Sequence, residues 1–182
     1  AGAGAGAAAG AAGSITSVAS VAFATGLQKA GYATDPAYAD KAARISALTK
    51  DLSELLPELV PALKGKVKTG PTLAFYPPCT LQHGQQLRGG VETHLNALGF
   101  NVKIATCESH LCCGSAGTYS VLQPELAYQL RDRKLAALEP LQAQAIVSAN
   151  IGCIQHLQTG TPIPVRHWIE VLDDVLARLR SF

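Results

Sequence analysis

TLAFYPPCTLQHGQQLRGGVETHLNALGFNVKIAT, which spans residues 72–106, is the stretch that decides the predicted fold. It predicts a short apolar strand at 72–76, a helix at 85–98 and a second strand at 101–106. A strand, a helix and a strand in this order are typical of a βαβ unit, whose two strands run parallel. We therefore expect a parallel sheet to begin here.

The same alternation continues to the end of the chain. The pattern predicts helices within 118–138, a third strand at 145–149, a short helix at 151–158, a fourth strand at 163–166 and an amphipathic closing helix at 168–179. Strands that alternate with helices favour parallel pairing and right-handed crossovers. We predict an α/β fold: a small, mostly parallel sheet flanked by helices.

A helical segment precedes this sheet. The Asp-Pro pair at 35–36 is typical of a helix start and predicts a helix at 37–48. Residues 51–63 carry leucine and valine at helical spacing. Pro57 and Pro61 are expected to bend or divide this second helix, because proline cannot donate the backbone hydrogen bond.

The composition argues against several classes of function. The 182 residues are 48% hydrophobic, which is enough to bury one ordinary core. The net charge is only +2 and aromatic residues make up 5%, so we expect no nucleic-acid partner. No apolar run reaches the roughly 18 residues that cross a bilayer, and no secretion signal is recognisable. We expect a cytoplasmic protein, whose membrane association, if any, is peripheral and on the inner membrane.

The cysteines are the most informative residues. Each of the five follows the carboxyl end of a predicted strand or lies in the loop beyond it: Cys79, Cys107, Cys112, Cys113 and Cys153. Open parallel sheets bind ligands at that edge, so we expect sulfur atoms from three loops to converge there. An odd number of cysteines without a secretion signal favours metal binding or redox chemistry over a disulfide framework.

The surroundings of the cysteines favour a bound inorganic group. Thiolates select zinc, copper(I) or iron–sulfur clusters. The small residues 114–117 would let backbone amides approach such a group, and the helices that follow would direct their positive ends at it. His83, His110 and His156 are candidates for further ligands or for hydrogen-bond donors to the ligands.

Two neighbouring features have simpler interpretations. Cys107 ends an apolar strand, where a single cysteine is more often a small core hydrophobe than a ligand. The charged run Arg-Asp-Arg-Lys at 131–134 is expected to form a solvated helix face, with a docking surface as the alternative.

The order and spacing of the cysteines resemble a known family. Cys79 is followed after 32 residues by Cys112-Cys113-Gly114, and after a further 38 residues by Cys153-Ile-Gln-His156. This pattern is similar to that of the cysteine-rich CCG domain. Flanking segments, such as SHLCCGSAGTY at 109–119 and VRHWIE at 165–170, resemble in particular the iron–sulfur subunits of bacterial glycolate oxidases.

The resemblance implies an electron-transfer role. In that family, FAD-containing partner subunits oxidise glycolate, and the iron–sulfur subunit passes the electrons on towards the quinone pool. The chain itself would then be a non-catalytic subunit of an oxidoreductase complex. The resemblance further implies that Cys79, Cys112, Cys113 and Cys153 bind an iron–sulfur cluster, expected to be [4Fe–4S], with His156 as a fifth ligand or a donor to a ligand.

The resemblance also implies a division of the chain. Residues 67–182 would be the cysteine-rich CCG domain, and residues 35–66 a helical connector that precedes it. Residues 1–34, which begin with a run of alanine and glycine, would be the remnant of a preceding module.

Some alternatives stay open at this point. His156 stands where the fuller motif has a cysteine, which leaves the type of cluster undecided, and Cys107 does not belong to the motif. Cysteine and histidine ligands could instead close a structural zinc site that braces the fold or an interface. The pair Cys112-Cys113 could also act in thiol–disulfide exchange, although a ring between adjacent cysteines is strained.

Overall fold

The computed structural model of the protein describes residues 24–180. The chain divides between Thr49 and Lys50 into two compact units. In the described part, the first unit contains a helix at 24–29 and α2 (Tyr38–Leu48), and the second contains the sheet and the remaining helices. Most of the segment interpreted as the remnant of a preceding module, residues 1–23, lies outside the described residues.

Asp35 sets the start of α2. Its Oδ1 atom accepts a hydrogen bond of 2.9 Å from the N–H of Ala37, and its carboxylate forms an ion pair of 2.6 Å with Lys41. The helix begins at Tyr38, one residue later than the sequence predicts. No side chain caps the first turn of α2 itself, so the contacts of Asp35 order the turn that leads into the helix.

The second unit is built on a sheet of four short parallel strands. These are β1 (Thr72–Phe75), β2 (Asn101–Lys103), β3 (Ala145–Ser148) and β4 (Val165–His167), hydrogen-bonded in the order β2-β1-β3-β4. In the register, Leu73 of β1 lies opposite Val102 on one side and Ala145 on the other. The predicted α/β fold with a mostly parallel sheet and a preceding helical segment is confirmed.

The strand order reverses between β1 and β3. From β1 the chain crosses to β2 through α4 (Gly90–Ala97), whereas from β3 it crosses to β4, on the opposite side, through α7 (Ile151–Gln158). The loops that leave the carboxyl ends of β1 and β3 therefore separate and leave a crevice between them. Parallel sheets bind their ligands at such a point.

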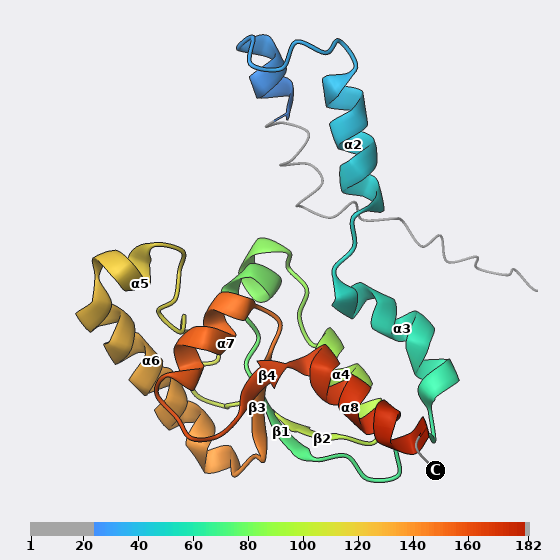
Figure 1. Cartoon of the computed structure of the whole chain (residues 1–182), viewed down its shortest axis with the longest axis vertical. Helices are drawn as coiled ribbons and strands as arrows, with labels where there is room; N and C mark the ends of the chain where they lie inside the picture. Colours follow the sequence, from blue (N-terminus) through green and yellow to red (C-terminus); the bar gives the residue numbers. More distant parts are fainter. Residues whose placement is uncertain (1–23, 181–182) are drawn as a thin grey trace, which may run out of the picture. The chain divides into compact units, whose positions relative to one another are not determined.

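Helices cover both faces of the sheet. Besides α4 and α7 they are α3 (Leu52–Leu63), the short α5 (Tyr119–Leu122), α6 (Pro124–Leu138) and α8 (Trp168–Arg180). In Figure 1, α4 and α8 lie on one side of the strands, and α6 and α7 lie on the other. None of the helices that the structure describes combines the length and apolarity required to span a bilayer.

Successive residues of β1 point into two different cores. Leu73 and Phe75 pack with residues of α3, α4 and α8, such as Leu56, Leu95 and Trp168. Ala74 and Tyr76 face the other side, among residues of α6 and α7, and Cys113 and Cys153 belong to that same core. The period of two in a strand thus separates a purely apolar core from one that contains thiols.

The helix predicted at 85–98 begins only at Gly90. A π-turn at Thr80–Gly84 follows Cys79, and the backbone then passes through positive φ at Gln86 (60°) and Gly89 (76°). A residue in the left-handed region cannot continue a right-handed helix. The residues before Gly90 therefore form the rim of the crevice instead of a first helical turn.

The helix α3 is not divided by its two prolines. Asp51 and Glu54 close a capping box at its start, and Leu56 is fully buried against the apolar core. Pro57 and Pro61 are both exposed, so that the carbonyl groups left without a helical partner can be hydrated. The capping box and the burial of Leu56 therefore stabilise α3 as one helix of the second unit.

Candidate functional site

Three loops at the carboxyl edge of the sheet enclose a cavity of about 390 Å³. The first loop follows β1, the second carries the adjacent cysteines, and the third opens α7. The lining residues are Pro78, Cys79, Thr80, Cys112, Ser115, Ala116, Gly117, Asn150, Gly152 and Cys153. The expected convergence of sulfur from three loops is what the structure shows, and all five cysteines are free thiols.

Ser115 connects two of these thiols. Its Oγ atom lies 3.4 Å from Sγ of Cys113 and 3.9 Å from Sγ of Cys153, so its hydroxyl group is within hydrogen-bonding distance of both sulfur atoms. Cys113 is fully buried behind the cavity wall, and Cys153 is nearly so. Residues 40 positions apart in sequence thus share one hydroxyl group.

The thiols of Cys113 and Cys153 compete for one proton. Hydrogen bonding from Cys153 lowers the pKa of Cys113 to about 5, with help from Ser115 and against the effect of burial. The same contact, together with burial, raises the pKa of Cys153. At neutral pH we expect a Cys113 thiolate that accepts a hydrogen bond from the Cys153 thiol.

Cys79 and Cys112 form a second interacting pair. Burial raises the pKa of Cys79, and negative charge on Cys112 raises it further, whereas hydrogen bonding from the Tyr76 hydroxyl lowers it. Charge on Cys113 also raises the pKa of Cys79, and charge on Cys112 raises that of Cys153. All four thiols are therefore close enough to affect one another's ionisation.

Gly114 allows the loop of adjacent cysteines to pack against α6. Its φ is +91°, and a Cβ atom there would lie 2.4 Å from the carbonyl oxygen of Ala127. Its N–H donates to Sγ of Cys112 at 3.4 Å. No side chain fits here without moving backbone, so glycine is required for both the conformation and the space.

The start of α7 points at the same cavity. Oδ1 of Asn150 accepts a hydrogen bond of 3.2 Å from the N–H of Cys153 and so caps the helix. A Cβ atom on Gly152 would lie 3.2 Å from that oxygen and 3.4 Å from Oγ of Ser115. The positive end of the helix and a small residue therefore meet the thiols, which favours their anionic form.

Tyr76 and Lys134 belong to the site although the sequence analysis did not select them. Tyr76 is 1% exposed, and its hydroxyl oxygen accepts a hydrogen bond of 3.1 Å from the N–H of Cys113. Lys134 is also 1% exposed, and its Nζ atom lies 5.0 Å from the centre of the Tyr76 ring. Burial and negative charge on Cys113, Cys153 and Cys79 raise the pKa of Tyr76, which keeps its hydroxyl protonated.

The expected solvated face at 131–134 is wrong for Lys134. Asp132 and Arg133 are exposed, but Lys134 lies on the buried side of α6 together with Ala127 and Leu138. Lys134 lies 7 residues after Ala127 and 4 before Leu138, a spacing that places all three on one face of a helix. This spacing could have predicted the burial of Lys134, but its charge favoured the prediction of an exposed position. Burial places its ammonium group over the ring of Tyr76 and against the Glu108 carbonyl instead of in water.

Cys107 is exposed, which corrects its interpretation as a core hydrophobe. The strand β2 ends at Lys103 rather than at the predicted residue 106, so Cys107 lies in the surface loop that follows. It does not line the cavity of the other cysteines.

The histidines lie outside the cavity wall. His83 and His110 are exposed. His156 is one turn beyond Cys153 on α7, where its ring stacks on Tyr128 and its Nε2 atom lies 3.1 Å from the carbonyl oxygen of Ala127. A ring nitrogen that donates to a carbonyl leaves the other nitrogen as an acceptor, so the role of His156 as a ligand stays a prediction.

Within residues 24–180, no three His, Cys, Asp or Glu side chains already form a metal-ion site. Cys79, Cys112 and Cys153 line the cavity, and Cys113 is buried next to it, 3.4 Å from the lining residue Ser115. The thiols interact in two pairs, Cys113 with Cys153 and Cys79 with Cys112. A set made only of sulfur donors suits soft ions and iron–sulfur clusters and does not suit magnesium or calcium. The donor chemistry therefore fits an iron–sulfur group held by these cysteines.

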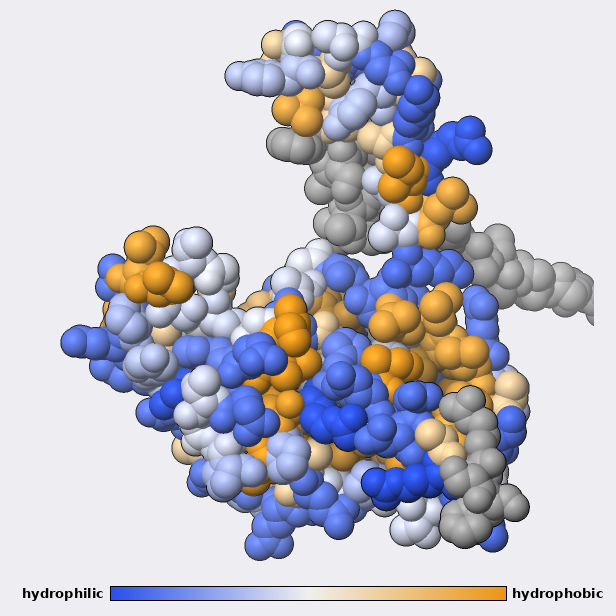
Figure 2. Space-filling view, in the orientation of Figure 1, coloured by the Kyte–Doolittle hydropathy of each residue, from blue (hydrophilic) through white to orange (hydrophobic). Residues whose placement is uncertain are grey.

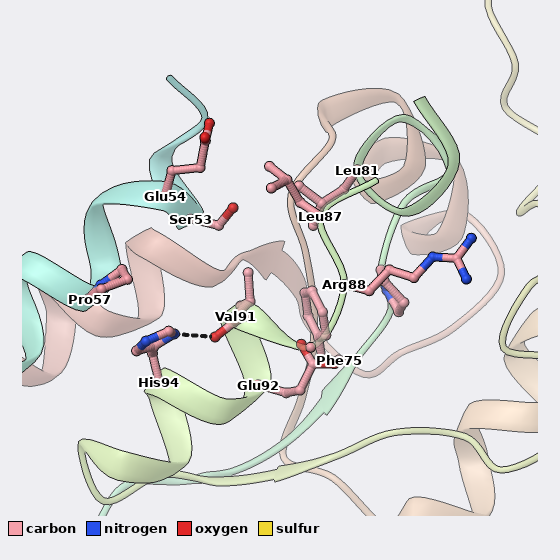
Figure 3. A pocket seen from close by; sticks show the side chains of 13 residues that line it. Ser53, Glu54, Pro57, Phe75, Leu81, Leu87, Arg88, Val91, Glu92 and His94 are labelled. Atoms are coloured by element: carbon pink, nitrogen blue, oxygen red, sulfur yellow. Dashed lines mark hydrogen bonds between the residues drawn. The ribbon is translucent and has the colours of Figure 1, made fainter. Parts of the chain in front are cut away.

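A second cavity of about 200 Å³ lies beside α3 and α4 and contains no cysteine. In Figure 3, Phe75, Leu81 and Leu87 are among its apolar side chains. Its two basic side chains already have backbone partners: Arg88 donates to the carbonyl of Gln82 at 3.0 Å, and Nδ1 of His94 lies 2.6 Å from that of Gly90. The carboxylate residues Glu54 and Glu92 also line this cavity, which otherwise offers mainly apolar surface.

Large apolar side chains are exposed on the elements that follow the cavity loops. They include Val121 (77%) and Leu122 (71%) of α5 and Ile151 (69%), which precedes the lining residue Gly152. Figure 2 shows hydrophobic side chains gathered at the tip formed by α5. Exposed apolar groups of this kind are typical of contact surfaces.

Comparison with known proteins agrees with the geometry. Residues 73–158, which contain the four converging cysteines, match the family model described as a cysteine-rich domain, CCG. The chain is 50% identical over 144 residues to the glycolate oxidase iron-sulfur subunit of Escherichia coli K12, an alignment that covers 79% of this chain and 35% of that protein.

Two further relatives are lactate utilization proteins A. Identity is 28% over 148 residues with the protein of Geobacillus thermodenitrificans and 26% over 150 residues with that of Bacillus licheniformis. Each alignment covers 76% of this chain and 60% of the relative. The chain thus spans about a third of the length of the glycolate oxidase subunit and less than two thirds of these two proteins. Its residues 73–158 belong to the CCG family of cysteine-rich domains, and the chain is a relative of the glycolate oxidase iron–sulfur subunit.

Proposed function

We propose that this chain is part of an electron-transfer subunit and holds an iron–sulfur cluster through Cys79, Cys112, Cys113 and Cys153. The observation that carries the proposal is the convergence of free thiols from three loops: Cys79, Cys112 and Cys153 line one cavity, and Cys113 is buried beside its lining residue Ser115. The likeness to an iron–sulfur subunit supports it.

The cluster would accept and release single electrons. The residues of the chain would hold it and adjust its charge. The cysteines would supply thiolates, while the N–H of Gly114 and the hydroxyl groups of Ser115 and Tyr76 would donate hydrogen bonds to sulfur. Donors to sulfur and burial are two of the factors that set a cluster's reduction potential. A [4Fe–4S] cluster is the form that we propose.

The complex would oxidise glycolate or another small 2-hydroxy acid. An FAD-containing subunit would carry out that reaction, and this chain would pass the electrons on towards a quinone, at the surface of the inner membrane. The support for glycolate is the 50% identity to a glycolate oxidase subunit, and the exposed side chains of α5 are available for contact with a partner.

Metal analysis of the chain purified without oxygen tests the proposal. We expect bound iron and acid-labile sulfide, and an EPR signal in one oxidation state. Cys79→Ser and Cys112→Ser should each lose most of the iron, because each removes a ligand. Cys107→Ser is the matched control and should keep it, since Cys107 is exposed and outside the cavity.

Other outcomes would contradict the proposal. One zinc ion per chain with no iron would support a structural metal site instead. Equal iron in wild type and in both serine variants would mean that the cluster is held elsewhere. Circular dichroism of each variant separates loss of the cluster from loss of the fold. His156→Ala, assayed in the same way, shows whether His156 is a ligand.

A further inference from the structure

A further cavity, of about 700 Å³, lies at the amino edge of the sheet and shares no lining residue with the cavity of the cysteines. It forms where residues 67–71, which link α3 to β1, face the second half of α8, and the two segments lie side by side in Figure 1. The starts of β3 and β4 contribute Ala145 and Pro164. Its volume falls in the range of roughly 300–1,000 Å³ that is typical of sites for small molecules.

Buried apolar side chains form the walls of this cavity. They come from the linking segment, from β1 and from α8, and are Val67, Leu73 and Val171. The linking segment is fixed at Gly70, whose N–H donates to the carbonyl of Gly99 at 3.0 Å. A Cβ atom on Gly70 would lie only 2.8 Å from Cδ1 of Phe100, so this segment packs closely on the chain beneath it. The cavity is therefore bounded by well-packed parts of the second unit.

Positive charge predominates around these walls. The described lining residues include three cations, Lys68, Arg166 and Arg178, and a single carboxylate, Asp174. Nη1 of Arg166 donates to Oδ2 of Asp174 at 2.6 Å, so these two charges offset each other. Lys68 and Arg178 are exposed, and neither forms a salt bridge with any residue of the part that the structure describes. The described lining thus has an excess of two positive charges.

We propose that this cavity binds a small organic anion with an apolar body, such as a carboxylate on a hydrocarbon chain. The walls would contact the apolar body, while Lys68 and Arg178 would attract the anionic group. Apolar walls with a few charged groups at fixed positions are typical of ligand sites, and the excess positive charge selects an anion over a cation. The proposal does not depend on the proposed function, because the two cavities have no residue in common.

Isothermal titration calorimetry of the full chain, purified without oxygen, with decanoate at neutral pH tests the site. Decan-1-ol carries the same hydrocarbon chain without the charge, and inorganic phosphate carries charge without the chain. We expect decanoate to bind at one site per chain and about threefold or more tightly than decan-1-ol, because exposed ion pairs contribute only modestly. Phosphate should show no measurable binding.

Two neighbouring lysines separate this site from general surface charge. Lys68→Gln and Lys66→Gln make the same chemical change at exposed positions, but only Lys68 lines the cavity. We expect Lys68→Gln, and likewise Arg178→Gln, to raise the Kd of decanoate about twofold to fivefold, and Lys66→Gln to leave it near wild type. Asp174→Asn should lower this Kd, because it removes the carboxylate that repels the ligand.

Several outcomes would overturn the site. Equal affinity for decanoate and decan-1-ol would mean that only apolar surface is bound, and failure of decanoate to bind the folded wild type would refute the proposal directly. An equal rise of Kd in Lys66→Gln and Lys68→Gln would indicate diffuse surface charge. Binding to vesicles of phosphatidylglycerol without binding to free decanoate would indicate contact with a membrane surface instead. Circular dichroism confirms the fold of each variant.

Discussion

Gly114 and Ala127 are in closer contact than any other residue type at position 114 would permit. A Cβ atom on Gly114 would lie 2.4 Å from the carbonyl oxygen of Ala127 and 3.0 Å from its Cα. The same carbonyl lies 3.1 Å from Nε2 of His156. The loop of adjacent cysteines, α6 and α7 therefore meet at a single carbonyl group, and the position of the thiols depends on this contact.

Gly114→Ala should destabilise the protein by about 2–5 kcal/mol, because it combines a left-handed backbone with a clash against backbone. Gly117→Ala is the matched control in the same loop. Its φ is also positive (+54°), but nothing lies within 4 Å of a Cβ there, so it should cost only about 1–2 kcal/mol. Urea denaturation measures both. Equal losses would mean that the contact with Ala127 is unimportant.

Tyr76→Phe should cost about 1–3 kcal/mol of stability, since the buried N–H of Cys113 loses its acceptor. The ring, and with it the contact to Lys134, is kept. Tyr128→Phe removes the same hydroxyl from a half-exposed ring and should change stability by less than about 0.5 kcal/mol. Denaturant unfolding of the reduced, metal-free chain checks the pair, and a negligible loss in Tyr76→Phe would show that the hydrogen bond contributes nothing.

Leu56→Ala tests whether α3 is part of the folded second unit or only a connector. Leu56 is fully buried in the apolar core, so its truncation should cost about 2–5 kcal/mol. Leu59 lies on the same helix but is 44% exposed, and Leu59→Ala should cost less than about 1 kcal/mol. Both are measured by unfolding in urea. A small effect of Leu56→Ala would favour the connector.

The ion pair between Arg166 and Asp174 predicts a pH dependence. The two groups lie 2.6 Å apart, and hydrogen bonding from Arg166 lowers the pKa of Asp174, aided by the charges of Arg166 and Arg178. A lowered carboxyl pKa stabilises the fold above the ordinary pKa of aspartate, and this contribution disappears as the pH falls through the lowered value. Wild type should therefore have a higher melting temperature than Asp174→Asn at pH 7.

The difference between the two proteins should shrink as the pH is lowered below about 4. Glu170 is also close to Arg166, so Glu170→Gln provides a comparison that leaves the Asp174 contact in place. Thermal unfolding from pH 7 to pH 3 measures the trend. A difference that stays constant over this range would contradict the prediction, because it could not arise from ionisation of Asp174.

The order of elements and the meeting of the cysteines could be predicted from the sequence, because both depend on local patterns. Alternation of strands with helices implies a parallel sheet, and cysteines that follow such strands must lie at its carboxyl edge. The bounds of α7, Ile151–Gln158, agree with the predicted residues, since Asn150 caps the helix locally.

The residues that the sequence did not predict depend on distant parts of the chain. Lys134 is buried because its ammonium group meets the Glu108 carbonyl and the Tyr76 ring, both far away in sequence. Cys107 is exposed because β2 ends early, and Gln86 takes a φ of 60° to lead the chain around the crevice. For Cys107 and Gln86 the neighbouring sequence carries no signature, and for Lys134 the helical spacing with Ala127 and Leu138 was outweighed by its charge.

The reversal of strand order between β1 and β3 has a consequence for biosynthesis. The four thiols are contributed by segments that start at Cys79, Cys112 and Cys153, and they face one another only after β1 and β3 have paired. A nascent chain that has been synthesised only as far as Cys113 lacks both β3 and the last of these sulfurs. A site that uses all four thiols can therefore be completed only after Cys153 has been synthesised and β3 has paired with β1.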